Sequence, residues 1–479
     1  MTMITRYDDI NLTKEQNDCV NYNAGNLLIK GIAGAGKSLV LLKRAIKLQK
    51  ETDGKIAIFT YANTLVYYTK EIIERQKISE DRIDISTLDS YCTSLYRRMS
   101  NKSISFLDDK TRKAIVKEVI KNHQIKTRLN HRFYKINEDF WCEEFSWIKG
   151  KNIRTEEEYI NSDRTGRGCK IRMSANDKRF AYSMYKDYIT LLAQKGKVEL
   201  EDLYRYILDN KYKIPNDKKI DYVLIDEAQE LPQIKLLVVK EITTKALTIA
   251  ADHAQKIYKN SFTWKELGIN FQGRASKQLN KTFRSTKQII LLANEVLKQN
   301  KSPLTNDYIK PMIPEAEGSK PQIINCKNEL TRKNCLCNIL KNLLKKSDAT
   351  IGILYRKYNE GLMYKSWMQE ENIDYEYFDK EKPWSLLKPG VKITTFHSAK
   401  GLEFDIVIIP KIDDENIPKT ALAYTEKDEI EEVLESERSL LYVGMTRARN
   451  RLLMFTQSGQ ISRFFKNISK EFYDVHDIS

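Results

Sequence analysis

The stretch from Gly31 to Ser38 constrains this chain more than any other, because it reproduces the phosphate-binding pattern G-x-x-x-x-G-K-[S/T]. The apolar run Leu27–Ile29 before it predicts a buried strand, and residues 39–46 after it have the apolar spacing of a helix. A glycine-rich turn that arose by chance is the alternative, and the flanking strand and helix disfavour it. The segment therefore predicts a loop that binds a nucleoside triphosphate.

The residue types of this loop explain how it would hold a triphosphate. Gly34 and Gly36 let the backbone curl so that successive N–H groups point at phosphate oxygens, and the helix that follows presents its positive end to the same anion. We expect Lys37 to reach the β- and γ-phosphates. Ser38 is expected to supply a hydroxyl to Mg²⁺, which takes few protein ligands.

Two acidic residues follow a second predicted buried strand, Tyr222–Ile225. The carboxyl ends of strands form the ligand-binding edge of open α/β sheets. We expect Asp226 to hold Mg²⁺, directly or through water, and Glu227 to polarise the water that attacks the γ-phosphorus. Acids that merely end a strand are the alternative, which the phosphate loop makes weaker.

Apolar, β-branched runs recur along the chain with helical patterns between them, which is typical of doubly wound α/β domains with buried parallel sheets. They form two clusters, the first at 27–29, 56–59, 222–225 and 247–250 and the second at 351–355, 391–395, 406–409 and 452–455. The pattern predicts a first lobe in residues 1–94 and 216–278, an inserted helical subdomain in 95–215, and a second lobe in 279–479.

The bulk composition narrows the class of partner. A chain of 479 residues is too long for one core, and its net charge of +16 favours a polyanion such as nucleic acid, although charge for solubility alone is an alternative. It contains no stretch of about 18 uncharged apolar residues, so we expect no membrane insertion. Seven scattered cysteines fit a reducing cytoplasm better than a disulfide framework.

Further segments follow in order along the chain. They are Asn11–Gln16, Thr60–Asn63, Thr87–Ser90, Asp252–Tyr258, Asn280–Ser285, Thr394–Phe404 and Leu441–Arg449. With the phosphate loop and Asp226–Gln229, this set resembles the motifs of UvrD/Rep-like superfamily 1 helicases from about residue 11 to 456. The last two segments are the most distinctive. The resemblance implies two RecA-like lobes, a 1B-like helical insertion, and ATP with Mg²⁺ as ligands.

The resemblance also implies roles around the ATP. Gln16 would read the adenine edge, Phe283 would stack on the adenine where the family usually has Tyr, and Glu403 would bind the ribose hydroxyls. Gln255 would sense the γ-phosphate.

Arg284 and Arg447 would be arginine fingers supplied by the second lobe. Such groups neutralise transition-state charge only when the lobes close, which ties hydrolysis to domain closure.

The family's nucleic-acid contacts are matched less specifically. The resemblance places them at Tyr61, Asn63, Thr87, Thr395 and His397. The chain departs from the family in two ways that matter here. Asp89 stands where the family often has His, and residues 356–391 leave little room for the large second insertion called 2B.

Two functions remain after these observations. The first is an ATP-driven translocase or helicase on single-stranded or tailed DNA, with 3′ to 5′ movement implied by the resemblance. The second is an ATP-gated DNA-binding subunit that works with a separate nuclease or another protein partner, in repair or in defence against foreign DNA, and unwinds little alone. RNA stays open as the track, because phosphate contacts and base stacking tolerate both sugars.

Overall fold

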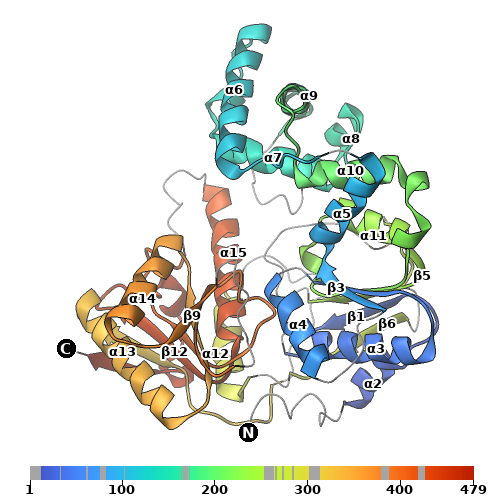
Figure 1. The fold of residues 1–479 in the computed structure, drawn as a ribbon. Coiled ribbons are helices and arrows are strands. Elements are labelled where there is room, and N and C mark those ends of the chain that lie inside the picture. The colour runs from blue at the N-terminus through green and yellow to red at the C-terminus, as the bar shows by residue number, and fades with distance from the viewer. Residues whose placement is uncertain are drawn as a thin grey trace.

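The computed structural model describes residues 12–32, 34–60, 63–75, 82–101, 103–162, 164, 171, 173–252, 264, 267–271, 275–282, 285–300, 313–378, 388–418 and 427–478. It contains two parallel β-sheets, each flanked by helices, and a group of helices that lies above them in Figure 1. The prediction of two α/β lobes with buried parallel sheets and an inserted helical part is therefore confirmed. Within the described ranges, every helix is too short or too polar to cross a lipid bilayer.

The first sheet has six parallel strands in the order β3-β2-β4-β5-β1-β6. They are β1 (Leu27–Gly31), β2 (Ile56–Thr60), β3 (Ile83–Thr87), β4 (Ile220–Ile225), β5 (Thr243–Ala251) and β6 (Ser276–Leu279). Because successive side chains point to opposite faces of a strand, Leu27 and Ile29 belong to one core cluster and Leu28 to another.

Helices cover both faces of this first sheet. The cluster on one face includes residues of α3 (Lys37–Glu51) and α4 (Asn63–Arg75), and α2 (Lys14–Val20) packs beside α3. The cluster on the other face draws on α5 (Leu88–Ser100), α10 (Leu200–Asp209) and α11 (Gln233–Ile242). The sheet is thus buried on both sides, which explains its continuous apolar strands.

The second sheet has seven parallel strands in the order β13-β7-β12-β11-β8-β10-β9. Its strands are β7 (Gln322–Cys326), β8 (Thr350–Tyr355), β9 (Tyr375–Tyr377), β10 (Gly390–Thr395), β11 (Phe404–Ile409), β12 (Ala448–Gln457) and β13 (Asp474–Ile478). Its helices are α12 (Lys287–Leu297), α13 (Glu329–Lys346), α14 (Tyr358–Glu370) and α15 (Lys427–Met445). Helix α14 and strand β9 lie within the interval 356–391.

The helical subdomain has an aromatic core of its own. Helices α6 (Asp109–Thr127), α7 (Glu138–Gly150), α8 (Glu156–Asn161) and α9 (Ala175–Gln194) surround buried rings that include Phe133, Trp141 and Tyr188. Beneath this core, the buried Lys149 Nζ on α7 lies 2.6 Å from Glu199 Oε2 at the start of α10. This ion pair fixes the subdomain to the helix that returns to the first lobe.

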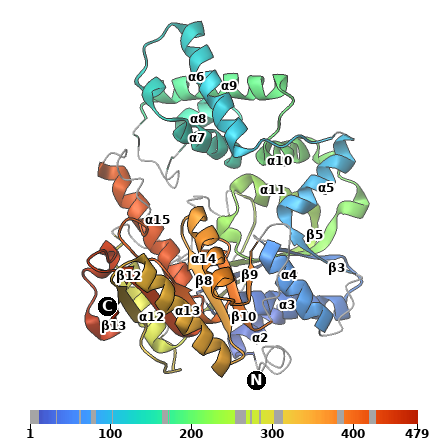
Figure 2. The same ribbon diagram turned by 60° about the vertical axis from the view of Figure 1, so that its left-hand side comes forward.

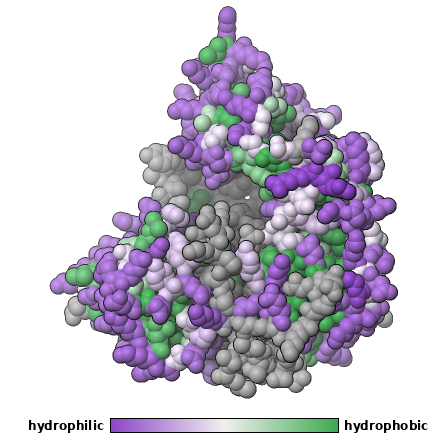
Figure 3. All heavy atoms as spheres, viewed as in Figure 1, coloured by the Kyte–Doolittle hydropathy of each residue, from purple (hydrophilic) through white to green (hydrophobic). Residues whose placement is uncertain are grey.

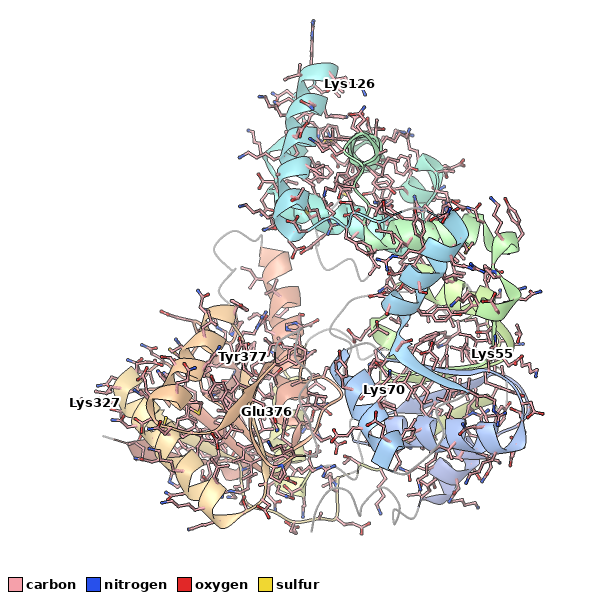
Figure 4. All side chains as sticks on the ribbon, viewed as in Figure 1. Lys55, Lys70, Lys126, Lys327, Glu376 and Tyr377 are labelled. Atoms are coloured by element: carbon pink, nitrogen blue, oxygen red, sulfur yellow. The ribbon has the colours of Figure 1, made fainter. Side chains whose placement is uncertain are left out.

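Two further views show how the three parts are arranged. Figure 2, turned from Figure 1, keeps the helical subdomain above both lobes, and the described surface in Figure 3 is largely hydrophilic. Lys126 marks the tip of the subdomain, and Lys55 and Lys327 lie on the outer sides of the two lobes (Figure 4). Lys70 on α4 and Glu376 on β9 lie instead where the lobes face each other (Figure 4).

Candidate nucleotide-binding and hydrolysis site

The phosphate loop has the backbone that its glycines predict. Gly34 and Gly36 have φ angles of +71° and +79°, in the left-handed region that favours glycine. Gly36 is also the N-cap of α3 and makes no side-chain capping bond, so the first N–H groups of the helix are left for another acceptor. A Cβ at Gly31 would lie only 2.9 Å from Lys37 Cγ. These features form a cradle that fits a phosphate group.

Lys37 closes this cradle from inside. Its Nζ donates to the carbonyl oxygens of Gly31 and Ile32, at 3.0 Å each, and lies 3.5 Å from Asp252 Oδ2. Because β5 lies between β1 and β4 in the sheet, Asp252 at the end of β5 stands between the phosphate loop and the acids that follow β4. The Lys37 ammonium group is therefore held at the phosphate loop, next to the carbonyl oxygens of Gly31 and Ile32.

Ser38 and Asp226 meet at the edge of the sheet. Ser38 Oγ donates to Asp226 Oδ2, although the two residues are far apart in the sequence. Burial, followed by the neighbouring Glu227, raises the pKa of Asp226 to about 6. The hydroxyl of Ser38 and the buried carboxylate of Asp226 are hard oxygen ligands of the kind that Mg²⁺ prefers. A bound cation would offset the cost of keeping this buried carboxylate charged.

Glu227 lies beside Asp226 in an unusual backbone conformation, with φ +55°. Gln229 Nε2 donates to Glu227 Oε2, while Gln229 Oε1 accepts from the backbone N–H of Asp252 at 2.9 Å. Burial opposes ionisation of Glu227, but Lys400, Lys37 and Arg447 together lower its pKa to about 2. Glu227 is thus a fixed carboxylate surrounded by cations, in a left-handed conformation that non-glycine residues adopt at a cost of about 1–3 kcal/mol.

Two cations of this group come from the second lobe. Lys400 Nζ, in the turn after β10, donates to Glu230 Oε1 at 2.5 Å and lies 3.6 Å from Glu227 Oε2. Arg447, between α15 and β12, is buried and donates from Nε to the carbonyl oxygen of Val443 at 2.9 Å. Both lobes therefore contribute to the charge around Glu227.

Two of the three predicted nucleoside contacts, Gln16 and Glu403, are described and have partners within the protein. Gln16 Nε2 donates to the carbonyl oxygen of Ala35 in the phosphate loop at 3.0 Å, and its Oε1 accepts from the N–H of Thr13. Glu403 Oε2 accepts from Arg449 Nε at 2.9 Å and also from Nη2. Gln16 is thus at the phosphate loop, whereas Glu403 is held within the second lobe.

The described nucleic-acid candidates lie at the carboxyl ends of strands in both sheets. Thr87 ends β3 and caps α5, its Oγ1 accepting from the N–H of Ser90 at 3.2 Å. Thr395 ends β10 and its Oγ1 accepts from the N–H of Ser398 at 3.0 Å, and His397 lies in the same turn. They lie at the same edge of each sheet as the nucleotide-site residues.

Several predicted residues fall outside what the structure describes. Tyr61, Gln255, Phe283 and Arg284 are not among the described residues, and Asn63 begins α4 but its side chain is not described. Their assigned roles stay predictions.

Three residues of the site have no role in the sequence analysis. Lys400 and Gln229 stand inside quoted motifs, and Asp252 begins one, but motif position alone does not reveal that they surround Glu227. Lys400 and Glu230 are 170 positions apart in the sequence. Only the folded arrangement brings them together.

Comparison with known protein families gives two matches. Residues 12–264, more than half of the chain, match the UvrD/REP helicase N-terminal domain. Residues 379–459 match the UvrD-like helicase C-terminal domain.

Curated relatives cover most of this chain. A protein named "Probable DNA helicase II homolog" from Mycoplasma capricolum is 26% identical over 75% of this chain and 49% of its own length. The "ATP-dependent DNA helicase PcrA" of Staphylococcus epidermidis is 23% identical over 79% of this chain and 53% of its own length, and that of Staphylococcus aureus is 22% identical over 78% and 53%. The chain thus spans about half the length of these relatives.

Proposed function

This chain belongs to the UvrD/REP helicase family, and we propose that it hydrolyses ATP between its two lobes and uses the cycle to move 3′ to 5′ along single-stranded DNA. The observation that carries the proposal is the convergence of Lys400 and Arg447, from the second lobe, on Glu227 of the first. Because cations of the second lobe contribute to the charge around Glu227, hydrolysis would depend on the relative position of the two lobes. We place this activity in the cytoplasm, where the free thiols of the described cysteines would stay reduced.

The chemistry follows from the side chains. When bound, Mg²⁺ would neutralise charge on the β- and γ-phosphates, and Ser38 and Asp226 are the residues that would hold it. Lys37 would exchange its two loop carbonyls for phosphate oxygens. Glu227, with its pKa lowered, would accept a hydrogen bond from the attacking water and orient it, which is the main demand of a loose phosphoryl-transfer transition state.

Arg447 would act as an arginine finger, together with Arg284. A guanidinium that reaches the γ-phosphate only from the second lobe stabilises transition-state charge when the lobes are closed. With residues 1–94 and 216–278 as the first lobe and 279–479 as the second, each cycle of closing and opening would shift a strand held across their strand ends by Thr87 and Thr395.

The direct test is ATPase activity with and without single-stranded oligonucleotides of deoxythymidine or uridine. We expect stimulation by the DNA strand and displacement of streptavidin from a biotinylated 5′ end in preference to a 3′ end. An ATPase indifferent to every strand would overturn translocation. Stimulation by the RNA strand alone would replace DNA with RNA as the track.

One structural observation favours a second candidate, the ATP-gated subunit that works with a nuclease or another protein partner. Helix α14 and strand β9 lie within residues 356–391, the short interval where a 2B domain would be inserted. A chain without this insertion is expected to unwind a 3′-tailed duplex poorly by itself. Efficient unwinding by the purified chain would remove the reason for this alternative.

A further inference from the structure

A hollow of about 550 Å³ lies beside α5, away from the nucleotide site. Its lining comes from α5, from the segment that leads into the helical subdomain, and from the first residue of α10. The lining residues are Asp89, Ser90, Thr93, Ser94, Arg97, Phe106, Leu107 and Leu200. Its volume is within the range of about 300–1,000 Å³ typical of small-ligand sites. In Figure 1, α5 lies between the strands of the first lobe and the helical subdomain.

One wall of the hollow is polar. Ser90, Thr93, Ser94 and Arg97 are spaced i, i+3, i+4 and i+7, so they share one face of α5. Ser90, Ser94 and Arg97 are exposed to solvent. Hydroxyl groups and a guanidinium along one face are the side chains that bind sugar and phosphate oxygens of nucleic acids.

The remaining wall is apolar. Phe106 is a large hydrophobic residue with 42% of its surface exposed, and it lines the hollow with Leu107 and Leu200. Two hydrogen bonds position the backbone on either side of Phe106, from Leu107 N–H to the Val198 carbonyl at 3.0 Å and from Val198 N–H to the Ser105 carbonyl at 3.2 Å. An exposed ring on such a backbone offers a surface on which a nucleobase can stack.

Asp89 gives the hollow an acceptor. Its Oδ1 accepts from Lys235 Nζ at 2.5 Å and from the hydroxyl of Tyr204, so its charge is balanced. Oδ2 is left to accept from a ligand, and carboxylates pair with the exocyclic amine of a base such as cytosine. This pairing assigns a use to the acid that stands where the family often has His.

From these contacts we propose that the hollow binds one nucleotide of a single strand, with its base stacked on Phe106, its amino edge at Asp89 and its backbone along Ser94 and Arg97. The proposal rests on the proposed function, because the same strand would pass the end of β3. Thr87 ends that strand and caps α5, so the hollow continues directly from a predicted nucleic-acid contact. The site would hold the strand while the lobes change position.

Binding of fluorescent deoxycytidine oligonucleotides to the full chain, measured by anisotropy, tests the ring. Loss of a base-stacking ring should weaken binding by about 5- to 100-fold in Phe106→Ala. Tyr212→Ala is the matched control, because Tyr212 is 77% exposed but does not line the hollow. We expect the control to bind like the wild type.

The arginine and the acid have separate readouts. Arg97→Ala should reduce the magnitude of the slope of log affinity against log salt concentration by about one. Arg98→Ala, which changes an exposed neighbour outside the lining, should reduce that magnitude less. Asp89→Asn should reduce the ratio of affinities for deoxycytidine over deoxythymidine oligonucleotides, with circular dichroism to verify folding.

A photocrosslink separates failure of this site from failure of the proposed function. An oligonucleotide carrying 5-iododeoxycytidine should crosslink to the peptide that contains Phe106. If the wild type binds no strand, both the proposed function and the proposed site are wrong. If the wild type binds strongly but Phe106→Ala equals Tyr212→Ala and the crosslink maps elsewhere, the site alone is wrong.

Discussion

Glu227 is a buried carboxylate to which Lys37, Lys400 and Arg447 all contribute positive potential. Replacement by Gln keeps the shape and removes the charge, so we expect nucleotide binding to persist while turnover falls about 10²- to 10⁴-fold. Lys37→Ala should instead weaken nucleotide binding. Steady-state ATPase and titration with a fluorescent ATP analogue measure both effects. Glu241→Gln on α11 is the control, and a Glu227→Gln enzyme within tenfold of wild type would contradict the assignment.

Gly36 combines a left-handed backbone with a close neighbour. Alanine there costs about 1–2 kcal/mol for the backbone, and its Cβ would lie 2.7 Å from Gln16 Nε2. Gly459 has a similar φ of +76° but nothing within 4 Å of an added Cβ. We therefore expect both alanine variants to lower the thermal unfolding midpoint, and only Gly36→Ala to lose nucleotide affinity as well. Equal affinity in the two variants would refute a role for the cradle.

His123 on α6 is expected to make the helical subdomain sensitive to acid. Its ring is buried, with Nδ1 2.5 Å from the Tyr134 hydroxyl and Nε2 3.1 Å from Ser183 Oγ. Burial lowers the pKa of His123 below the usual 6.5. The unfolded chain then binds a proton at this ring more readily than the folded chain does. His123 therefore leaves the free energy of unfolding undiminished above pH 6.5 and lowers it as the pH falls through 6.5.

Thermal unfolding at pH 7.5 and 5.5 measures that decline. His123→Gln should reduce the loss of unfolding temperature between the two pH values, and the exposed His476→Gln should not. Some loss is expected to remain, because burial also lowers the pKa of His131. An unchanged pH dependence in His123→Gln would exclude it as the sensitive group.

The strands were predictable where burial dominates. All eight predicted runs lie within β1, β2, β4, β5, β8, β10, β11 and β12, because strands buried on both faces need continuous apolar sequence. Strands β3, β6, β7, β9 and β13 are not predicted. Strand β6 reads Ser-Lys-Gln-Leu at a sheet edge and β13 is exposed along its length, so their pairing depends on a neighbour and not on apolar sequence.

The chemistry of the site was partly predictable. Local patterns single out Lys37, Ser38 and Asp226. Lys37 Nζ donates to the Gly31 carbonyl oxygen and Ser38 Oγ donates to Asp226, and their roles toward ATP and Mg²⁺ stay predictions. The contact between Lys400 and Glu230 is different, because its partners stand on different lobes. A linear pattern carries no information on which distant ion pairs form when two lobes meet.

The second lobe completes the surroundings of Glu227. Lys400 reaches Glu230 directly, and Arg447 adds to the positive potential at Glu227. The apolar core is also shared, because one cluster contains residues of both sheets, such as Ile29 and Val407. The two lobes therefore meet through apolar packing as well as through charge.

The most direct test of hydrolysis between two lobes is the single-turnover rate of ATP hydrolysis in Arg447→Ala, measured together with the Kd for ATP. We predict a fall in rate of about 10³-fold or more with a change in Kd below tenfold, because a finger acts on the transition state. Arg451→Ala, on β12, should keep both values. A hydrolysis rate in Arg447→Ala equal to that of the wild type would contradict the account.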